Sequence, residues 1–229
     1  MNIFLRVDAS IHIGTGHVMR CLTLADKLKG QGATTAFICR HITEPLKQLI
    51  CENGHTLVFL PQHDPALISE DSLLAHAKWI GVPQSIDAKD TLLAIGETTC
   101  DFLIVDHYAL DIRWESALRQ SAKKIMVIDD IADRQHDCDV LLDQNYYFDM
   151  QDRYLNLISV NTQKLLGPKY ALLNQAFIDS SQNICHKTGL VKRVLVFFGG
   201  IDKDNYTQLV LEALVKLALP NIKVDVIIG

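Results

Sequence analysis

Short apolar runs alternate with longer amphipathic segments along most of this chain, and that alternation constrains the fold more than any other feature. Apolar runs of this kind are typical of parallel strands that are buried on both faces. The longer segments repeat apolar residues at helical spacing, as Val18, Leu22, Ala25 and Leu28 do. We therefore predict an α/β fold with a Rossmann-type parallel sheet. The predicted strands span 3–7, 34–39, 56–60, 102–105, 125–128 and 140–142, and the predicted helices span 17–30, 44–52, 67–80, 87–99 and 111–121.

A second domain is expected to begin near residue 193. The pattern loosens after Asp143, and residues 180–192 form the most polar stretch, which is typical of a linker. Residues 193–229 then restart with a strand, a helix and another strand. So small a unit cannot bury its own core, so it either extends the first sheet or begins a second, truncated Rossmann-like domain. We favour the second interpretation, with domains at 1–179 and 193–229 joined by the linker 180–192.

Composition excludes several classes of protein. The chain has 229 residues and a formal net charge of −5, without the basic clusters that nucleic-acid binding requires. It contains no apolar run long enough to span a membrane, and its start breaks at Arg6 and Asp8, unlike a signal peptide. We therefore expect a cytoplasmic protein. The six scattered cysteines are expected to be free thiols, with a zinc site at His136, Asp137 and Cys138 as the less favoured alternative. The sequence carries no signal of oligomeric state.

Polar and titratable residues gather where the predicted strands end. Because ligands bind outside the carboxyl ends of parallel strands, this concentration is the main argument from the residues for a functional site. The residues are Asp8, Ser10, Gly14, Gly16, His17, Asp106, His107, Asp129, Asp130, Asp143, Gln144 and Asn145.

The loop that holds Gly14 and Gly16 is not the dinucleotide fingerprint, because a third glycine is missing at position 19. It is either a tight strand-to-helix turn or an anion site in which helix N-terminal amides face a diphosphate. His17 is expected in the first turn of the helix, with Arg20 one turn further on. The helix N-terminus and Arg20 disfavour imidazolium, so His17 acts either as a general base or as a phosphate anchor.

The carboxylates leave a metal site open as an alternative. We expect Asp8 and Asp106 to face the crevice, and we expect Asp130 to cap the turn that follows its strand. Asp129 and Asp130 are adjacent, and neighbours at a strand end point in opposite directions. We therefore disfavour a Mg²⁺ site and expect no metal and no cofactor.

Seven segments together resemble the UDP-sugar hydrolases of the pseudaminic acid family, which are related in fold to MurG-like GT-B glycosyltransferases. They follow one another in order along the whole chain. They are RVDAS (6–10), IGTGHVMRCLTLA (13–25), LIVDHY (103–108), VIDDIA (127–132), LLDQN (141–145), LGPKYALL (166–173) and FGGID (198–202).

The resemblance implies a GT-B-like enzyme that releases UDP from a UDP-linked 2,4-diacetamido-2,4,6-trideoxy-β-L-altropyranose, in the nonulosonic acid pathway that serves flagellin glycosylation. It implies that His17 activates water for inverting attack at the anomeric carbon, without a metal. The small-molecule UDP-sugar is the expected partner. The implied substrate-binding residues are Asp8, Gly14, Gly16, Arg20, Tyr108, Asn145, Tyr170, Leu173, Gly199, Gly200 and Asp202.

Two other functions stay open at this point. A GT-B glycosyltransferase passes the sugar to an acceptor instead of water, and it needs the same diphosphate loop and a base. A non-catalytic nucleotide-sugar-binding module uses the loop without the chemistry.

Overall fold

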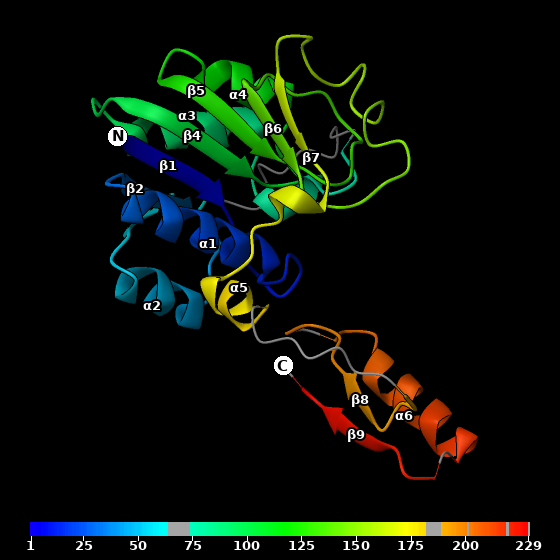
Figure 1. Cartoon of the computed structure of the whole chain (residues 1–229). Helices are drawn as coiled ribbons and strands as arrows, with labels where there is room; N and C mark the ends of the chain where they lie inside the picture. The colour runs from blue at the N-terminus through cyan, green and yellow to red at the C-terminus, as the bar shows by residue number, and fades with distance from the viewer. Residues whose placement is uncertain (64–73, 182–188, 201, 219, 229) are drawn as a thin grey trace. The chain divides into compact units, whose positions relative to one another are not determined.

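A parallel sheet of seven strands forms the larger part of the molecule in its computed structural model (Figure 1). The structure describes residues 1–63, 74–181, 189–200, 202–218 and 220–228. The strands of this sheet are β1 (Asn2–Val7), β2 (Thr34–Cys39), β3 (Thr56–Phe59), β4 (Cys100–Asp106), β5 (Ala122–Ile128), β6 (Val140–Asp143) and β7 (Gln163–Leu166). All neighbours pair in parallel. The predicted α/β fold with a parallel sheet is confirmed.

The strand order places a crevice between the first and fourth strands. The order is β3-β2-β1-β4-β5-β6-β7, so the chain builds outward from β1 in one direction and then from β4 in the other. The loops that follow β1 and β4 therefore diverge to opposite faces of the sheet. Such a switch point is where open α/β sheets bind their ligands.

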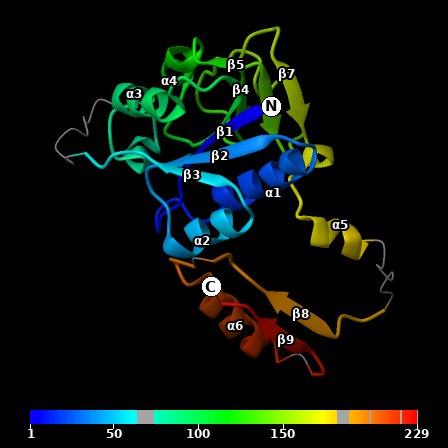
Figure 2. The same ribbon diagram turned by 90° about the vertical axis from the view of Figure 1, so that its left-hand side faces the viewer.

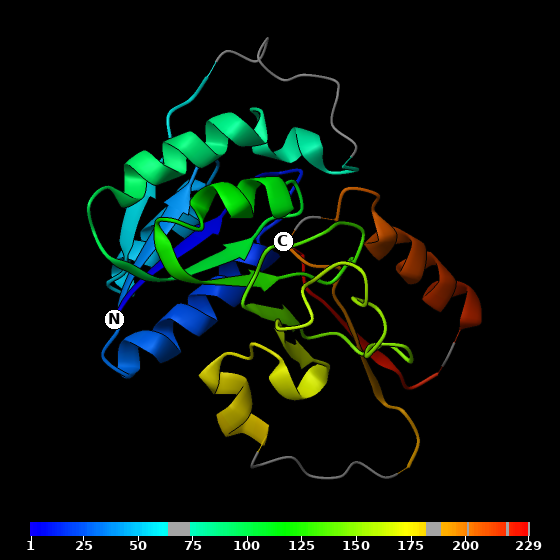
Figure 3. The same ribbon diagram turned by 90° about the horizontal axis from the view of Figure 1, so that it is seen from above.

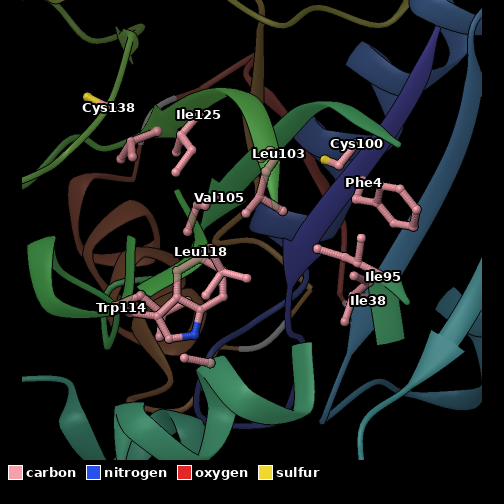
Figure 4. Close-up of a cluster of buried hydrophobic side chains, with 14 of the residues drawn as sticks. Phe4, Ile38, Ile95, Cys100, Leu103, Val105, Trp114, Leu118, Ile125 and Cys138 are labelled. Atoms are coloured by element: carbon pink, nitrogen blue, oxygen red, sulfur yellow. The ribbon is translucent and has the colours of Figure 1, made fainter. Parts of the chain in front are cut away.

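Helices cover both faces of the sheet (Figures 2 and 3). The helices α1 (Gly16–Gly30) and α2 (Glu44–Glu52) pack on one face, and α3 (Gln84–Ile95) and α4 (Ile112–Leu118) pack on the other. Alternate residues of β4 enter different cores: Leu103 and Val105 pack with α3 and α4, whereas Ile104 packs with α1 and α2. Figure 4 shows the first of these cores around Trp114 and Leu118.

Some observed elements differ from the prediction. The edge strand β7 was not predicted, because Gln163 and Lys164 are polar and exposed. The predicted helix 67–80 lies partly outside the described residues, and its described part holds only the short 3₁₀ helix η2 (Ala77–Ile80). The helix predicted at 87–99 is α3, which begins directly after Pro83 and ends at Ile95, before Gly96 with its φ of +61°.

The chain divides into two compact units, Met1–Asn174 and Gln175–Gly229. The second contains α5 (Gln175–Ser181), β8 (Arg193–Val196), α6 (Tyr206–Leu217) and β9 (Lys223–Val226), and β8 and β9 pair in parallel. The division thus falls before α5 rather than after residue 179. Most of the predicted linker, residues 182–188, lies outside the described residues. A two-stranded sheet buries little, and Leu195, Phe197 and Ile228 stay exposed.

Two simpler expectations concern cysteines and membranes. The five cysteines within the described residues are free, and Cys185 lies outside them. Among the described residues, no helix combines the length and the apolar character needed to cross a bilayer.

The short 3₁₀ helix η3 (Pro168–Tyr170) follows β7 and completes the first unit.

Candidate active site

The candidate site lies at the switch point between β1 and β4. Val7 and Asp106, the last residues of these two strands, are neighbours in the sheet. After β1, a loop over residues 8–15 leads into α1 and places His17 in its first turn. The topology thus joins His17 to Asp106, 89 residues further along the chain.

His17 and Asp106 form the central pair of the site. The Nδ1 atom of His17 lies 2.6 Å from Oδ1 of Asp106, whose carboxylate is fully enclosed. Burial opposes the ionisation of Asp106, but His17 and Arg20 outweigh burial and lower the pKa of Asp106 to about 2. An ionised carboxylate can only accept, so Nδ1 donates, and in the neutral ring the lone pair then lies on Nε2. The pair therefore holds His17 in the tautomer that can take a proton at Nε2.

Arg20 is committed to two carboxylates. Its Nε donates to Oδ2 of Asp106 at 2.6 Å, its Nη2 donates to Oδ1 at 2.6 Å, and its Nη1 donates to Asp130 at 2.9 Å. Its Nη2 also lies 3.2 Å from Nδ1 of His17, but both atoms carry hydrogen, so this is only a contact. In the structure the guanidinium of Arg20 positions Asp106 and Asp130, and its contact with substrate stays a prediction.

Asp130, and not its neighbour, faces the site. Its carboxylate accepts from Arg20 and from the hydroxyl of Tyr108. Asp129 instead points the other way, is fully buried, and accepts the backbone N–H of Ala132 at 2.9 Å. The expectation that Asp130 caps the turn is thus wrong, since Asp129 does so. The opposite orientation of the two carboxylates is the one predicted for neighbours at a strand end.

Aromatic rings pack against His17. The ring of Tyr108 meets His17 edge to face, with centroids 4.7 Å apart, and Trp79 lies 6.4 Å from His17 at a similar angle. His76 stacks at a tilt on Trp79, with centroids 4.3 Å apart. The structure therefore places Tyr108 beside His17, and its contact with the sugar stays a prediction. Sequence reasoning missed His76 and Trp79, because they lie on a segment that has no motif and was predicted to be helical.

Asp8 lies beneath the site and not within it. Its carboxylate has no exposed surface, accepts two hydrogen bonds from Arg6, and accepts the backbone N–H groups of Arg40 and His41. Burial opposes its ionisation, but Arg6 outweighs burial and keeps the pKa of Asp8 well below its usual value. The predicted substrate contact of Asp8 is corrected: its oxygens are used to tie the end of β1 to the end of β2.

The glycine loop has the geometry of an anion cradle. Gly14 adopts a φ of +81°, and an added Cβ there would meet no atom within 4 Å. Its N–H donates to the carbonyl of Ser10 at 2.8 Å, which closes the turn before the helix. No side chain of the described residues caps the N-terminus of α1, and the first turn holds no acidic residue. No side chain of the first turn therefore compensates the partial positive charge of the amides at the start of α1.

Three predicted sugar contacts follow β6 and β7. Asn145 is exposed, and its backbone N–H donates to Asp143 at 3.0 Å. Tyr170 is half-buried against the core under α1, and Leu173 is 52% exposed. No ring contact or hydrogen bond within the described residues joins them to His17. They lie at the same edge of the sheet, and their contact with substrate stays a prediction.

The glycines of the second unit form an exposed turn after β8. Gly199 has a φ of +84°, and Gly200 is exposed beside it. Asp202 was predicted to bind substrate, but its two oxygens accept the backbone N–H groups of Tyr206 and Thr207 at 2.9 and 2.8 Å. These two bonds hold the first turn of α6, whose N-cap residue is Asn205, and the contact of Asp202 with substrate stays a prediction.

No metal cluster is present in the described part of the chain, where no three His, Cys, Asp or Glu side chains gather around one point. The alternative zinc site is not assembled. His136 bonds Glu115 at 2.7 Å, whereas Asp137 bonds Arg119 at 2.7 Å and Cys138 packs into the core. The three side chains therefore have separate partners.

Curated sequences provide two relatives. The chain is 25% identical over 223 residues to the UDP-2,4-diacetamido-2,4,6-trideoxy-β-L-altropyranose hydrolase of Campylobacter jejuni, which covers 97% of this chain and 69% of that protein. It is 24% identical over 217 residues to an uncharacterized protein of Methanocaldococcus jannaschii, covering 93% of this chain. The chain spans only 40% of the length of that second relative. No model of a known protein family matches the chain.

Solved structures confirm the fold. MurG of Acinetobacter baumannii superposes with a TM-score of 0.55 at 11% identity, over 100% of this chain and 67% of that one. A glycosyltransferase of Rickettsia africae gives a TM-score of 0.54 at 13% identity, over 68% of its chain. The chain therefore has the Rossmann-like architecture of GT-B glycosyltransferases.

Proposed function

We propose that the chain carries the catalytic part of a nucleotide-sugar hydrolase of pseudaminic acid biosynthesis. The proposed substrate is a UDP-linked 2,4-diacetamido-2,4,6-trideoxy hexose of the altropyranose type, and the products are the free sugar and UDP. The observation that carries the proposal is the His17–Asp106 pair at the switch point, at 2.6 Å and next to an uncapped helix N-terminus. The name of the Campylobacter jejuni relative supports the choice of substrate.

His17 acts as the general base in this proposal. Its Nε2 takes a proton from a water molecule while the water oxygen forms a bond to the anomeric carbon. The bond from that carbon to the diphosphate oxygen breaks, and its electron pair leaves with UDP. Attack from the side opposite the leaving group inverts the anomeric configuration. Asp106 keeps the Nδ1 proton and stabilises the positive charge that His17 gains.

The remaining groups hold the reactants in place. The uncapped backbone amides at the start of α1, beginning at Gly16, are suited to the diphosphate, whose negative charge grows as the bond breaks, and Gly14 shapes the turn that leads into them. Tyr108 and Asp130 border the space beside His17. In the second unit, Gly199 and Gly200 stay the proposed nucleotide contacts. We place the reaction in the cytoplasm, in keeping with free thiols at the described cysteines.

A glycosyltransferase is the second candidate, favoured by the MurG-like fold alone. The two reactions differ in whether water or a sugar-bearing acceptor attacks. The decisive assay follows UDP release from the UDP-sugar without any acceptor. Release that His17→Asn reduces by about 10²-fold or more supports the hydrolase. Release only after an acceptor is added supports the transferase.

A histidine in the same loop provides the control. His12 is exposed, and within the described residues its side chain makes no hydrogen bond, while its backbone N–H donates to the hydroxyl of Ser10. We expect His12→Asn to keep the activity of the parent chain. Equal activity in the His17→Asn and His12→Asn variants would overturn the assignment of His17 as base.

A further inference from the structure

A cavity of about 520 Å³ lies away from the proposed reaction centre, where η2 and the segment after it meet α3 and α4. Neither His17 nor Asp106 lines it. Its volume is in the range of small-molecule sites, about 300–1,000 Å³. Its lining consists of Leu74, Ala75, Ala77, Lys78, Ile80, Val82, Pro83, Gln84, Ser85, Ala88, Lys89, Leu92, Ala109, Arg113, Trp114 and Ala117.

Small side chains make the room. Alanines stand at the contact points of η2, α3 and α4, at Ala77, Ala88 and Ala117. Larger side chains at these three positions would fill the gap. The floor is apolar and rigid, because Trp114 is fully buried and its indole N–H donates to the buried Asp87 at 2.9 Å. An apolar body inside the cavity would therefore meet a preformed surface.

The rim of the cavity is positively charged. Lys78, Lys89 and Arg113 line it from three different elements and are exposed. Arg113 is held by Asp111 at 2.6 Å, whereas no ion pair within the described residues joins Lys78 or Lys89 to a carboxylate. Among the described residues, the lining includes no aspartate or glutamate. The charge is thus opposite to that of the chain as a whole, which has a net charge of −5.

We propose that this cavity binds a small amphipathic anion, with an apolar body over Trp114 and a carboxylate or phosphate group between Lys78 and Lys89. The apolar floor selects the body through burial, and the lysines select the charge. The site is separate from the reaction at His17 and does not depend on the proposed function. The cavity and the candidate active site do share η2. Ala77, Lys78 and Ile80 line the cavity, whereas Trp79 packs toward His17.

Tryptophan fluorescence can follow binding directly. The chain has two tryptophans, so a Trp79→Phe variant leaves Trp114 in the cavity floor as the reporter. The probes are octanoate, octyl phosphate and the uncharged 1-octanol. We expect saturable quenching or a spectral shift with the two anions. We expect the double variant Lys78→Glu/Lys89→Glu to bind them at least about tenfold more weakly, and to bind octanol as before.

Two further variants separate this cavity from other apolar surfaces. Ala117→Phe fills it from its exposed rim, so the fold is expected to persist while binding of all three probes is lost. Lys123→Glu reverses the charge of an exposed lysine on β5 that does not line the cavity, and it should leave binding unchanged. Thermal unfolding of each variant checks the fold.

Comparison of the two anions identifies the head group. Binding of octanoate alone indicates a carboxylate, and binding of octyl phosphate alone indicates a phosphate. Binding that survives Ala117→Phe, or that is equal for octanol and the anions, would overturn the proposal. So would an absence of saturable binding by every probe.

Discussion

Replacing Asp106 by asparagine tests the central pair of the site with almost no change in shape. The carboxylate accepts His17 and Arg20 on Oδ1, and Arg20 and the thiol of Cys21 on Oδ2. An asparagine offers one acceptor and one N–H₂ donor in the same space. Whichever way the amide turns, it therefore directs hydrogens at a group that also donates.

The expected fall in kcat follows from these contacts. If the N–H₂ group faces His17, Nδ1 must accept, the proton moves to Nε2, and the base is lost. If it faces the Nε of Arg20, the tautomer survives but the negative charge is gone. A carboxylate about 4 Å from the imidazolium charge contributes about 4 kcal/mol at an effective dielectric of 20, and Arg20 offsets part of that. We expect kcat to fall by about 10²–10⁴-fold in either case.

The matched control is Asp130→Asn. Asp130 also binds Arg20 and lies beside Tyr108, but it has no recorded contact with His17. We expect its kcat to fall by less than about tenfold, since Asp130 meets Arg20 and Tyr108 while Asp106 alone accepts the Nδ1 hydrogen of His17. The assay is acceptor-independent UDP release by each variant, with circular dichroism to check the fold.

Nitrogen NMR of the His17 ring gives a second readout that needs no turnover. The parent chain should show the proton on Nδ1, and Asp106→Asn should shift it toward Nε2 or weaken its hydrogen bond. The reasoning is refuted if the parent carries its proton on Nε2. It is equally refuted if Asp106→Asn and Asp130→Asn lose the same activity.

Two other predictions concern stability. Burial alone would lower the pKa of His136, but Asp129 and Glu115 outweigh burial and raise it to about 9. The pKa of His136 is therefore higher in the folded chain than the unfolded value of about 6.5. Its protonation adds about 3 kcal/mol to the free energy of unfolding below pH 6.5, and this stabilisation is lost as the pH rises through 9. Urea unfolding at pH 6.5 and 9 should show that loss in the parent chain and not in His136→Gln; equal pH dependence would contradict it. Gly14→Ala should lower the free energy of unfolding by about 1 kcal/mol, because Gly14 has positive φ, whereas Gly16→Ala in the helix should not. Equal unfolding midpoints for the two alanine variants would refute the strain argument.

Hydrophobic patterning predicted the buried elements best. The strand at 34–39 and the helix at 44–52 were predicted with the bounds that β2 and α2 have. Their apolar residues face the core, so their burial produces the apolar pattern from which the two elements were predicted. The edge strand β7 exposes Gln163 and Lys164 and forms through backbone pairing with β6, which no side-chain pattern records. Sequence predicts an element well only when side-chain burial determines it.

For the candidate site, too, the sequence predicted some features and could not predict others. The strand-end rule gathered His17, Asp106 and Asp130 at one edge, because the carboxyl ends of parallel strands coincide there. The rule could not say which oxygen meets which donor. Asp8 ends β1 as Asp106 ends β4, yet backbone amides and Arg6 enclose it, whereas Asp106 meets the histidine. That difference depends on the strand order β2-β1-β4. The loop after β2 closes over the end of β1, so Asp8 is covered, and α1 carries His17 across to β4. The pairing of base and carboxylate is therefore a property of the topology, and only a structure could assign it.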